Sequence, residues 1–144
     1  MRAILTISIL LAILVGCSRK SAPVITTPTD AQISEFTRNA SITLPVAARP
    51  IGWREERGMD SALWMQVAMQ ASDLQSFLDS SPFRSATLTT NDQCHIFDFQ
   101  EFLPTPPAHY RCGEHQLPNA RYLKMLIDES QSTNVVVYLM WHET

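Results

Sequence analysis

The clearest pattern of hydrophobic and polar positions lies near the C-terminal end of the sequence. Between Tyr122 and Ile127 a large apolar residue occupies every second position, and from Val135 to His142 nearly every residue is apolar. The polar segment 128–134 separates the two stretches. Alternation with a period of two is typical of a half-buried strand, so we predict a β-hairpin with a long turn. Because both faces of the second strand are apolar, we expect it at the centre of a sheet or with one face against a partner.

Segment 61–80 is compatible with two structures. Every second residue from Leu63 to Met69 is large and apolar, which is typical of a strand. The apolar residues of the whole segment also fall on one face of a helix. The sequence Ser-Asp-Leu-Gln at 72–75 has the form of a capping box, which has no role inside a helix. We therefore predict a strand up to residue 70 and a helix from residue 72 to residue 80, with one long helix as the alternative.

The remaining elements of the C-terminal part are less regular. We expect a strand over 51–56 and a short strand over 85–90. Residues 91–118 are rich in proline and aromatic side chains and follow neither period. We predict a long irregular loop there, which is uncommon unless the loop is functional or cross-linked.

The first residues have the layout of an export signal. Arg2 precedes a run of thirteen uncharged, mainly apolar residues, 3–15, which is shorter than the roughly 20 that a spanning helix needs. The run leads into Leu-Val-Gly-Cys at 14–17, which resembles the lipobox of bacterial lipoproteins. The resemblance implies that the thiol of Cys17 carries lipid, that the peptide is cleaved before it, and that the mature chain is anchored to a membrane. It is confined to residues 1–18.

This resemblance implies a division of the chain and a location. We expect a signal peptide over 1–16, the lipidated cysteine and a flexible tether over 17–49, and a single globular α+β domain over 50–144. An uncleaved anchor and an ordinary signal peptide are the alternatives. Ser18 stands where lipoproteins kept at the inner membrane often carry Asp, so the resemblance favours the outer membrane, facing the periplasm, in a cell with two membranes.

The composition of the segment after Cys17 supports a tether. Residues 18–49 are mainly Ser, Thr, Ala, Pro, Asn and Gln, which cannot bury much surface, and the prolines among them favour an extended chain. Within this tether a short helix over 30–39 is expected, capped by Thr29 or Asp30.

Two cysteines remain once Cys17 carries lipid. In an oxidising compartment the pair Cys94 and Cys112 predicts one disulfide. Together with His95 and His115 the two thiols also make the ligand set of a tetrahedral zinc site, which is the alternative. The fold class expected overall is α+β: an antiparallel sheet of three to five strands with one helix packed on a face, plus a long disulfide-bounded loop.

Charge and motifs narrow the function classes. Loss of Arg2 with the signal peptide takes the net charge from −3 to −4, so nucleic acid is not an expected partner. The sequence has no Gly-x-Ser-x-Gly elbow, no His-Glu-x-x-His and no phosphate-binding glycine-rich loop. We therefore expect neither an enzyme nor a cofactor. A catalytic or metal-handling alternative would use Cys94, His95, Cys112 and His115, with Glu114 tuning His115.

The aromatic residues of the cysteine-bounded loop are the candidate partner-binding residues. They are Phe97, Phe99, Phe102 and Tyr110. They could form an apolar surface for a protein partner, or they could pack the loop onto the sheet. We expect a non-catalytic, membrane-anchored envelope protein that binds another protein. An inhibitor or immunity protein against a toxin or a wall-degrading enzyme is the alternative.

Overall fold

The computed structural model describes residues 27–84, 88–90, 94–103 and 105–144. The signal peptide and the lipid on Cys17, which the sequence predicts, lie outside the described residues.

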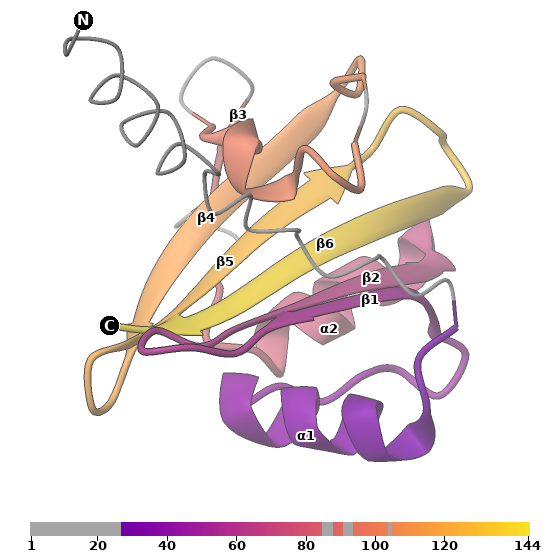
Figure 1. The fold of residues 1–144 in the computed structure, drawn as a ribbon. Coiled ribbons are helices and arrows are strands. Elements are labelled where there is room, and N and C mark those ends of the chain that lie inside the picture. The colour runs from indigo at the N-terminus through magenta and orange to yellow at the C-terminus, as the bar shows by residue number, and fades with distance from the viewer. Residues whose placement is uncertain (1–26, 85–87, 91–93, 104) are drawn as a thin grey trace, which may run out of the picture.

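Six strands form one sheet within the described residues, and each strand pairs antiparallel with its neighbours (Figure 1). The strands are β1 (Arg49–Glu56), β2 (Ala62–Gln70), β3 (Thr89–Thr90), β4 (Tyr110–Leu117), β5 (Arg121–Asp128) and β6 (Asn134–Glu143). Their order across the sheet is β1-β2-β6-β5-β4-β3. The α+β class and the antiparallel sheet are confirmed, but the predicted number of three to five strands is wrong.

The predicted C-terminal hairpin is strands β5 and β6, in which Lys124 lies opposite Met140. Strand β6 lies between β2 and β5, so its expected position at the centre of the sheet is confirmed. Tyr138 and Leu139, which face opposite sides of β6, are both buried. Residues 62–70 form strand β2, which decides against the single long helix.

Strand β4 is the element that the sequence does not predict. It lies inside residues 91–118, for which an irregular loop is expected, and its polar centre 113–116 shows no apolar alternation. β4 is a strand because each of its residues from Tyr110 to Leu117 pairs with a residue of β5. The backbone hydrogen bonds of a neighbouring strand therefore decide its conformation, and side-chain pattern does not. Strand β3 (Thr89–Thr90) lies at the end of the predicted 85–90, of which residues 85–87 are outside the described part of the chain.

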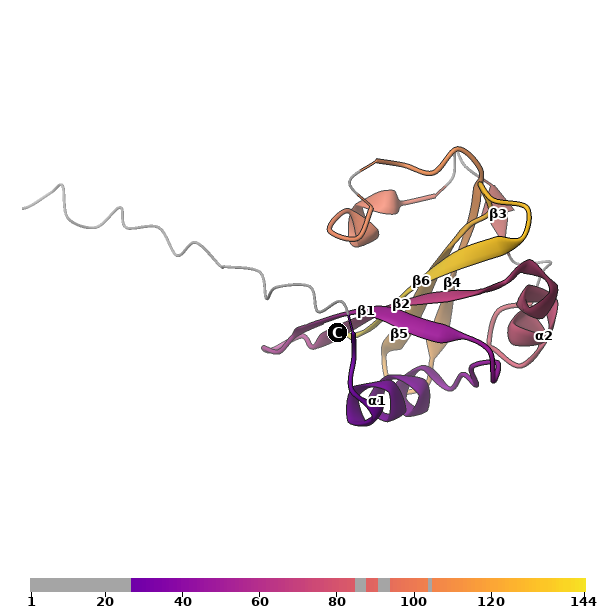
Figure 2. The ribbon, with the colours of Figure 1, turned by 90° about the vertical axis from the view of Figure 1, so that its right-hand side faces the viewer.

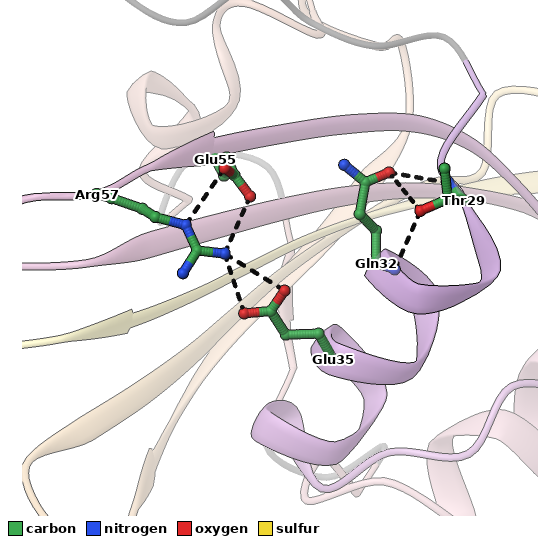
Figure 3. A network of polar contacts seen from close by, with 5 residues as sticks. All are labelled: Thr29, Gln32, Glu35, Glu55 and Arg57. Atoms are coloured by element: carbon green, nitrogen blue, oxygen red, sulfur yellow. Dashed lines mark hydrogen bonds and ion pairs between the residues drawn. The ribbon is translucent and has the colours of Figure 1, made fainter.

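Helix α1 (Asp30–Ala40) confirms the short helix expected near Thr29. The Gln32 N–H donates to Thr29 Oγ1 at 3.3 Å, and the Thr29 N–H donates to Gln32 Oε1 at 2.9 Å (Figure 3). These two bonds form a complete capping box. Phe36 and Ala40 of this helix are fully buried in the core. The tether predicted over 17–49 is therefore wrong for residue 28 onward, because α1 belongs to the folded domain.

Helix α2 (Leu74–Asp79) lies where a helix over 72–80 is predicted. Its predicted capping box does not form, since Asp73 is the N-cap and makes no side-chain hydrogen bond there. The preceding residues already turn as η1 (Ala71–Asp73), whose first N–H donates to Thr133 O at 3.0 Å. Ser72 thus lies inside a helical turn and cannot cap one. Among the described residues, no helix has both the length and the apolar composition that crossing a membrane requires.

The two faces of the sheet are covered differently (Figure 2). Odd-numbered residues of β2, β5 and β6 face α1 and α2, and we call this side the helical face. Its buried cluster joins the sheet to Phe36 of α1 and to Phe77 of α2. Even-numbered residues of the same strands form the opposite side, which residues 94–103 cover. We call these residues the strap and this side the strap face.

Candidate functional site: the strap and the hollow beside it

The strap crosses the sheet and is fixed covalently at its first residue. Cys94 is disulfide-bonded to Cys112 of β4, as the sequence predicts. The strap then forms the short helix η4 (Ile96–Phe99), and the N–H groups of Phe102 and Leu103 donate to Phe99 O. These backbone hydrogen bonds are internal to the strap and do not attach it to the sheet. Its position therefore depends on side-chain contacts with the sheet.

Antiparallel pairing aligns the even-numbered residues of the strap face in rows. One row runs Gly52, Gln66, Tyr138, Leu126 and Cys112. The next runs Arg54, Trp64, Met140, Lys124 and Glu114. A third begins with Glu56, Ala62, His142 and Tyr122. The strap contacts residues of the first two rows, and the third row is next to it.

Asp98 fixes the middle of the strap through two groups. Its backbone oxygen accepts a hydrogen bond from Trp64 Nε1 at 2.9 Å. Its carboxylate accepts one from Lys124 Nζ, also at 2.9 Å. Lys124 Nζ also lies 3.6 Å from Glu114 Oε2. Burial lowers the pKa of Lys124, but Asp98 and then Glu114 outweigh it, so the pKa is raised and the ammonium form is stabilised.

Arg54 fixes the far end of the strap. Its guanidinium lies 4.1 Å above the ring of Trp64, and its Nε lies 3.0 Å from Glu101 Oε2 in the strap. Its NH2 group also donates to Glu56 at 3.2 Å. Arg54 is only 8% exposed, and a charge so buried requires such partners. The Arg54–Glu101 contact is an ion pair without the alignment of a hydrogen bond.

Apolar contacts complete the attachment. The rings of Phe99 and Phe102 each lie 6.4 Å from the ring of Tyr138 on the central strand. Phe99 is buried together with Leu126. Gly52 allows a close approach of the strap, because a Cβ there would lie 3.0 Å from Phe102 Cε1 and 2.8 Å from the amide oxygen of Gln66, and both side chains would have to shift. The strap therefore contacts residues of β1, β2, β6, β5 and β4.

The structure separates the four candidate partner-binding residues. Phe99 is buried, and Phe102 and Tyr110 are half-buried against the sheet. Phe99 and Phe102 thus pack the loop onto the sheet, whereas Tyr110 is the first residue of strand β4 itself. Phe97 is different, because 78% of it is exposed. It extends from η4, between Asp98 and the disulfide, and so from the best-anchored part of the strap.

A hollow of about 790 Å³ lies beside the strap. The turn between β1 and β2, residues 55–61, and the end of β6, residues 140–144, surround it. Ala62, Trp64 and Met140 provide its apolar surface. Met59 is on the turn and is entirely exposed. Trp64 lines both this hollow and a smaller cleft that also contains Phe97.

Arg57 ties the turn at the hollow to helix α1. Figure 3 shows its guanidinium between the carboxylates of Glu55 and Glu35, at 3.3 Å and 3.2 Å. Hydrogen bonding and charge from Glu55, followed by those from Glu35, raise the pKa of Arg57. The positive charge of Arg57 is therefore already balanced within the protein.

His142 is the titratable ring of the third row. It stacks on Tyr122 with ring centres 5.2 Å apart and planes 15° apart. Burial and then the charge of Lys124 lower the pKa of His142, while Glu114 and Asp98 raise it less. Its Nε2 is buried without a hydrogen-bond partner among the described residues. The imidazole is thus neutral at pH 7 and adds no positive charge to the hollow.

The residues of the metal-handling alternative come together only in part, because His95, Cys112 and Glu114 line one small cleft and His115 lies apart from them. Cys94 and Cys112 are bonded to each other. Cys112 and His115 are three positions apart on β4 and so face opposite sides of the sheet. His115 lies against Phe83 on the helical side, with ring centres 6.3 Å apart. In the part of the chain that the structure describes, no three His, Cys, Asp or Glu residues are grouped to hold a metal ion.

Sequence reasoning did not identify Arg54, Trp64, Asp98 and Lys124 as residues of this site. Three of them could have been recognised as residues of one sheet face. Arg54, Trp64 and Lys124 are polar or amphipathic residues at alternate positions of predicted strands. Their shared row depends on strand order and register, which the sequence pattern does not contain.

Known proteins do not supply a function for this arrangement. Comparisons of the chain with protein-family models, with curated protein sequences and with solved structures give no match. The function is therefore inferred from the strap and the hollow themselves.

Proposed function

We propose that this is a lipid-anchored envelope protein that binds another protein without catalysing a reaction, with Phe97 at the centre of its binding surface. The observation that carries the proposal is an exposed aromatic side chain on a segment that is fixed on both sides. Aromatic residues dominate the free energy of protein interfaces when a partner buries them. A soluble surface otherwise seldom keeps a phenylalanine 78% exposed.

The rigidity of the strap supports this surface. Cys94 lies on one side of Phe97, and Asp98 and Glu101 lie on the other, each joined to a different strand. A segment that is already ordered loses little conformational entropy when it binds. The strap therefore presents Phe97 in one position to a partner.

The start of the folded domain bears on where the partner lies. Pro28 is buried and α1 follows it, so the tether between a lipidated Cys17 and the domain is only residues 17–27. Eleven extended residues span at most about 40 Å. We therefore propose that the partner is itself at the membrane or within reach of it, at no more than that distance plus the width of the folded domain.

The experiment is co-purification after cross-linking in cells, with the full-length tagged protein. Phe97→Ser removes the exposed ring, and Val46→Ser is the matched control, because Val46 is fully exposed on the loop between α1 and β1. We expect the same partner with the wild type and with Val46→Ser, and its loss with Phe97→Ser. Recovery of the partner with all three proteins, or of no specific partner with the wild type, would refute the proposed surface.

Lipid anchoring is tested separately by the mass of the protein purified from cells. We expect a chain that begins at Cys17 and carries acyl groups, and Cys17→Ser should abolish the acyl mass. An intact N-terminus on an unmodified chain would contradict anchoring and leave the protein-binding proposal to the cross-linking experiment.

An inhibitor or immunity protein is the second candidate, and the shape of the strap favours it. A rigid segment with one protruding aromatic side chain suits insertion into the cleft of an enzyme or toxin. If the partner recovered through Phe97 is a wall-degrading enzyme or a toxin, the purified protein should reduce its activity and Phe97→Ser should not. An unchanged activity would eliminate this candidate.

A further inference from the structure

The hollow beside the strap has a strong charge imbalance. Four carboxylates line it, those of Glu55, Glu56, Asp60 and Glu143, against the single guanidinium of Arg57. Arg57 is paired with Glu55, and Glu56 is paired with Arg54. Asp60 and Glu143 have no ion-pair partner among the described residues. The lining therefore carries a net charge of about −3 at neutral pH.

The strap adds to this imbalance. Asp98, Glu101 and Glu114 lie on the same face, and the cations beside them are Arg54 and Lys124, each already shared between two carboxylates. His142 brings no compensating positive charge, because it is neutral. The negative potential thus extends from the hollow toward Phe97.

The hollow also has apolar surface for an occupant to bury. Most of this surface in the sheet belongs to Met140, which is half-buried, because Ala62 and Trp64 are almost completely buried and expose little. Met59 extends from the turn, entirely exposed. Apolar surface beneath a ring of carboxylates suits a segment that combines an apolar side chain with lysine or arginine, whose methylene groups pack while the charge stays near the carboxylates.

From this charge complementarity we infer that the hollow is the docking site for a basic segment of the partner protein, with an apolar side chain of that segment against Met59 and Met140. The inference rests on the proposed function of protein binding and specifies the chemistry of the partner. Nucleic acids and anionic lipid surfaces are disfavoured, since their phosphates would be repelled.

The first experiment measures binding of a defined probe. The probe is a short peptide of lysine and leucine, and the comparison peptide has glutamate in place of lysine. The mature protein is held in nanodiscs of zwitterionic lipid, with empty nanodiscs as the blank. We expect the lysine peptide to bind, binding to weaken as salt is added, and the glutamate peptide not to bind.

Variants locate the binding on the protein. Asp60→Asn with Glu143→Gln removes two unpaired carboxylates of the hollow and should weaken the lysine peptide by about fivefold. The control, Asp73→Asn with Asp79→Asn, removes the same charge around α2, at the half-buried Asp73 and the exposed Asp79. It should change affinity less than twofold. Equal weakening by both pairs would show that only net charge matters and would overturn the inference, as would absence of binding.

The second experiment separates this inference from the proposed function. A photo-cross-linking amino acid is placed at Met59, at Phe97 or at Val46 in the full-length protein in cells. We expect Met59 and Phe97 to give adducts with one partner, and Val46 none. The peptide cross-linked to Met59 should carry a net positive charge.

Other patterns of cross-linking would refute one proposal or both. An adduct at Phe97 without one at Met59 leaves protein binding intact and refutes the hollow as a docking site. A neutral or acidic peptide cross-linked to Met59 refutes the basic segment. No adduct at any position refutes both proposals.

Discussion

The two faces of the sheet have the same backbone but are covered by different means. On the helical face, α1 and α2 contribute to one large cluster of buried apolar side chains. On the strap face, a much smaller buried cluster is combined with a disulfide, two ion-pair anchors and a cation–π contact. A helix satisfies most of its own backbone groups and needs only apolar contacts to pack. A segment such as the strap does not, so each part of it is held by a specific side chain.

This difference also separates stability from function. Loss of apolar burial on the helical face should reduce the free energy of unfolding of the whole domain. Loss of one anchor on the strap face should release a local segment while the sheet persists. The exposed aromatic residue lies on the strap face, where local change is tolerated, and the acidic hollow lies at the edge of the sheet, between the β1–β2 turn and the end of β6.

The largest expected effect tests the helical face. Phe36→Ala removes a fully buried ring that meets Trp53 edge-on at 6.2 Å. It should lower the free energy of unfolding by about 3–5 kcal/mol, measured by denaturant titration. Val46→Ala, at a fully exposed position, is the control and should change it little. A loss below about 1 kcal/mol would mean that α1 is not part of the core.

The disulfide provides the next test. Cys94→Ser with Cys112→Ser should cost about 3 kcal/mol, because the open loop gains entropy in the unfolded chain. Amide hydrogen exchange should also increase in residues 94–103 of the folded protein, while the amides of α1 remain protected. Equal deprotection of strap and helix would contradict the local character of the strap face.

A smaller effect is expected at the Arg54 anchor. Glu101→Gln removes the strap carboxylate but leaves Arg54 paired with Glu56. The free energy of unfolding should fall by about 1 kcal/mol, and the fluorescence of Trp64 beneath the guanidinium should change. Glu35→Gln, which removes a carboxylate partner of the exposed Arg57, is the comparison and should cost less. The reverse order would show that the buried anchor does not hold the strap.

The smallest effect is a pH dependence from His142. Its pKa in the folded protein lies below the ordinary 6.5, so the unfolded chain binds more protons as the pH falls. The contribution of the neutral His142 ring to the free energy of unfolding is fully present above the pKa of the unfolded chain. It is lost as the pH falls toward the lower pKa of the folded protein. Between about pH 7.5 and about pH 5.5, the wild type should lose slightly more stability than His142→Gln. Identical slopes would show that the ring is as solvated as in the unfolded chain.

The sequence was informative where one side-chain pattern dominates. The alternation in 122–127 and the apolar stretch 135–142 predicted β5 and β6, including the central place of β6. Thr29 predicted the start of α1. Local pattern was misleading at Ser72, where the capping-box sequence lies within η1, and at 113–116, where a polar segment is a strand. In both cases a contact with a distant part of the chain determined the structure, with Thr133 in the first and with β5 in the second.

The candidate site could be predicted only in part for the same reason. The disulfide followed from counting cysteines, and the aromatic residues of the loop were recognisable as a group. Phe99 is buried and Phe97 is exposed to solvent because of the direction in which η4 turns above the sheet. The acidic hollow was not predicted, because its carboxylates come from the β1–β2 turn and from the end of β6.

By itself, the amino-acid sequence determined the properties that depend on near neighbours: the period of the apolar residues, the cap of α1, the pairing of two cysteines and the net charge. Only the tertiary structure decided which residues share a row of the sheet, that residues 30–40 belong to the core, and that Arg54, Trp64 and Lys124 meet one segment. Strand order and register set those relations, and they arise from contacts between residues far apart in the chain.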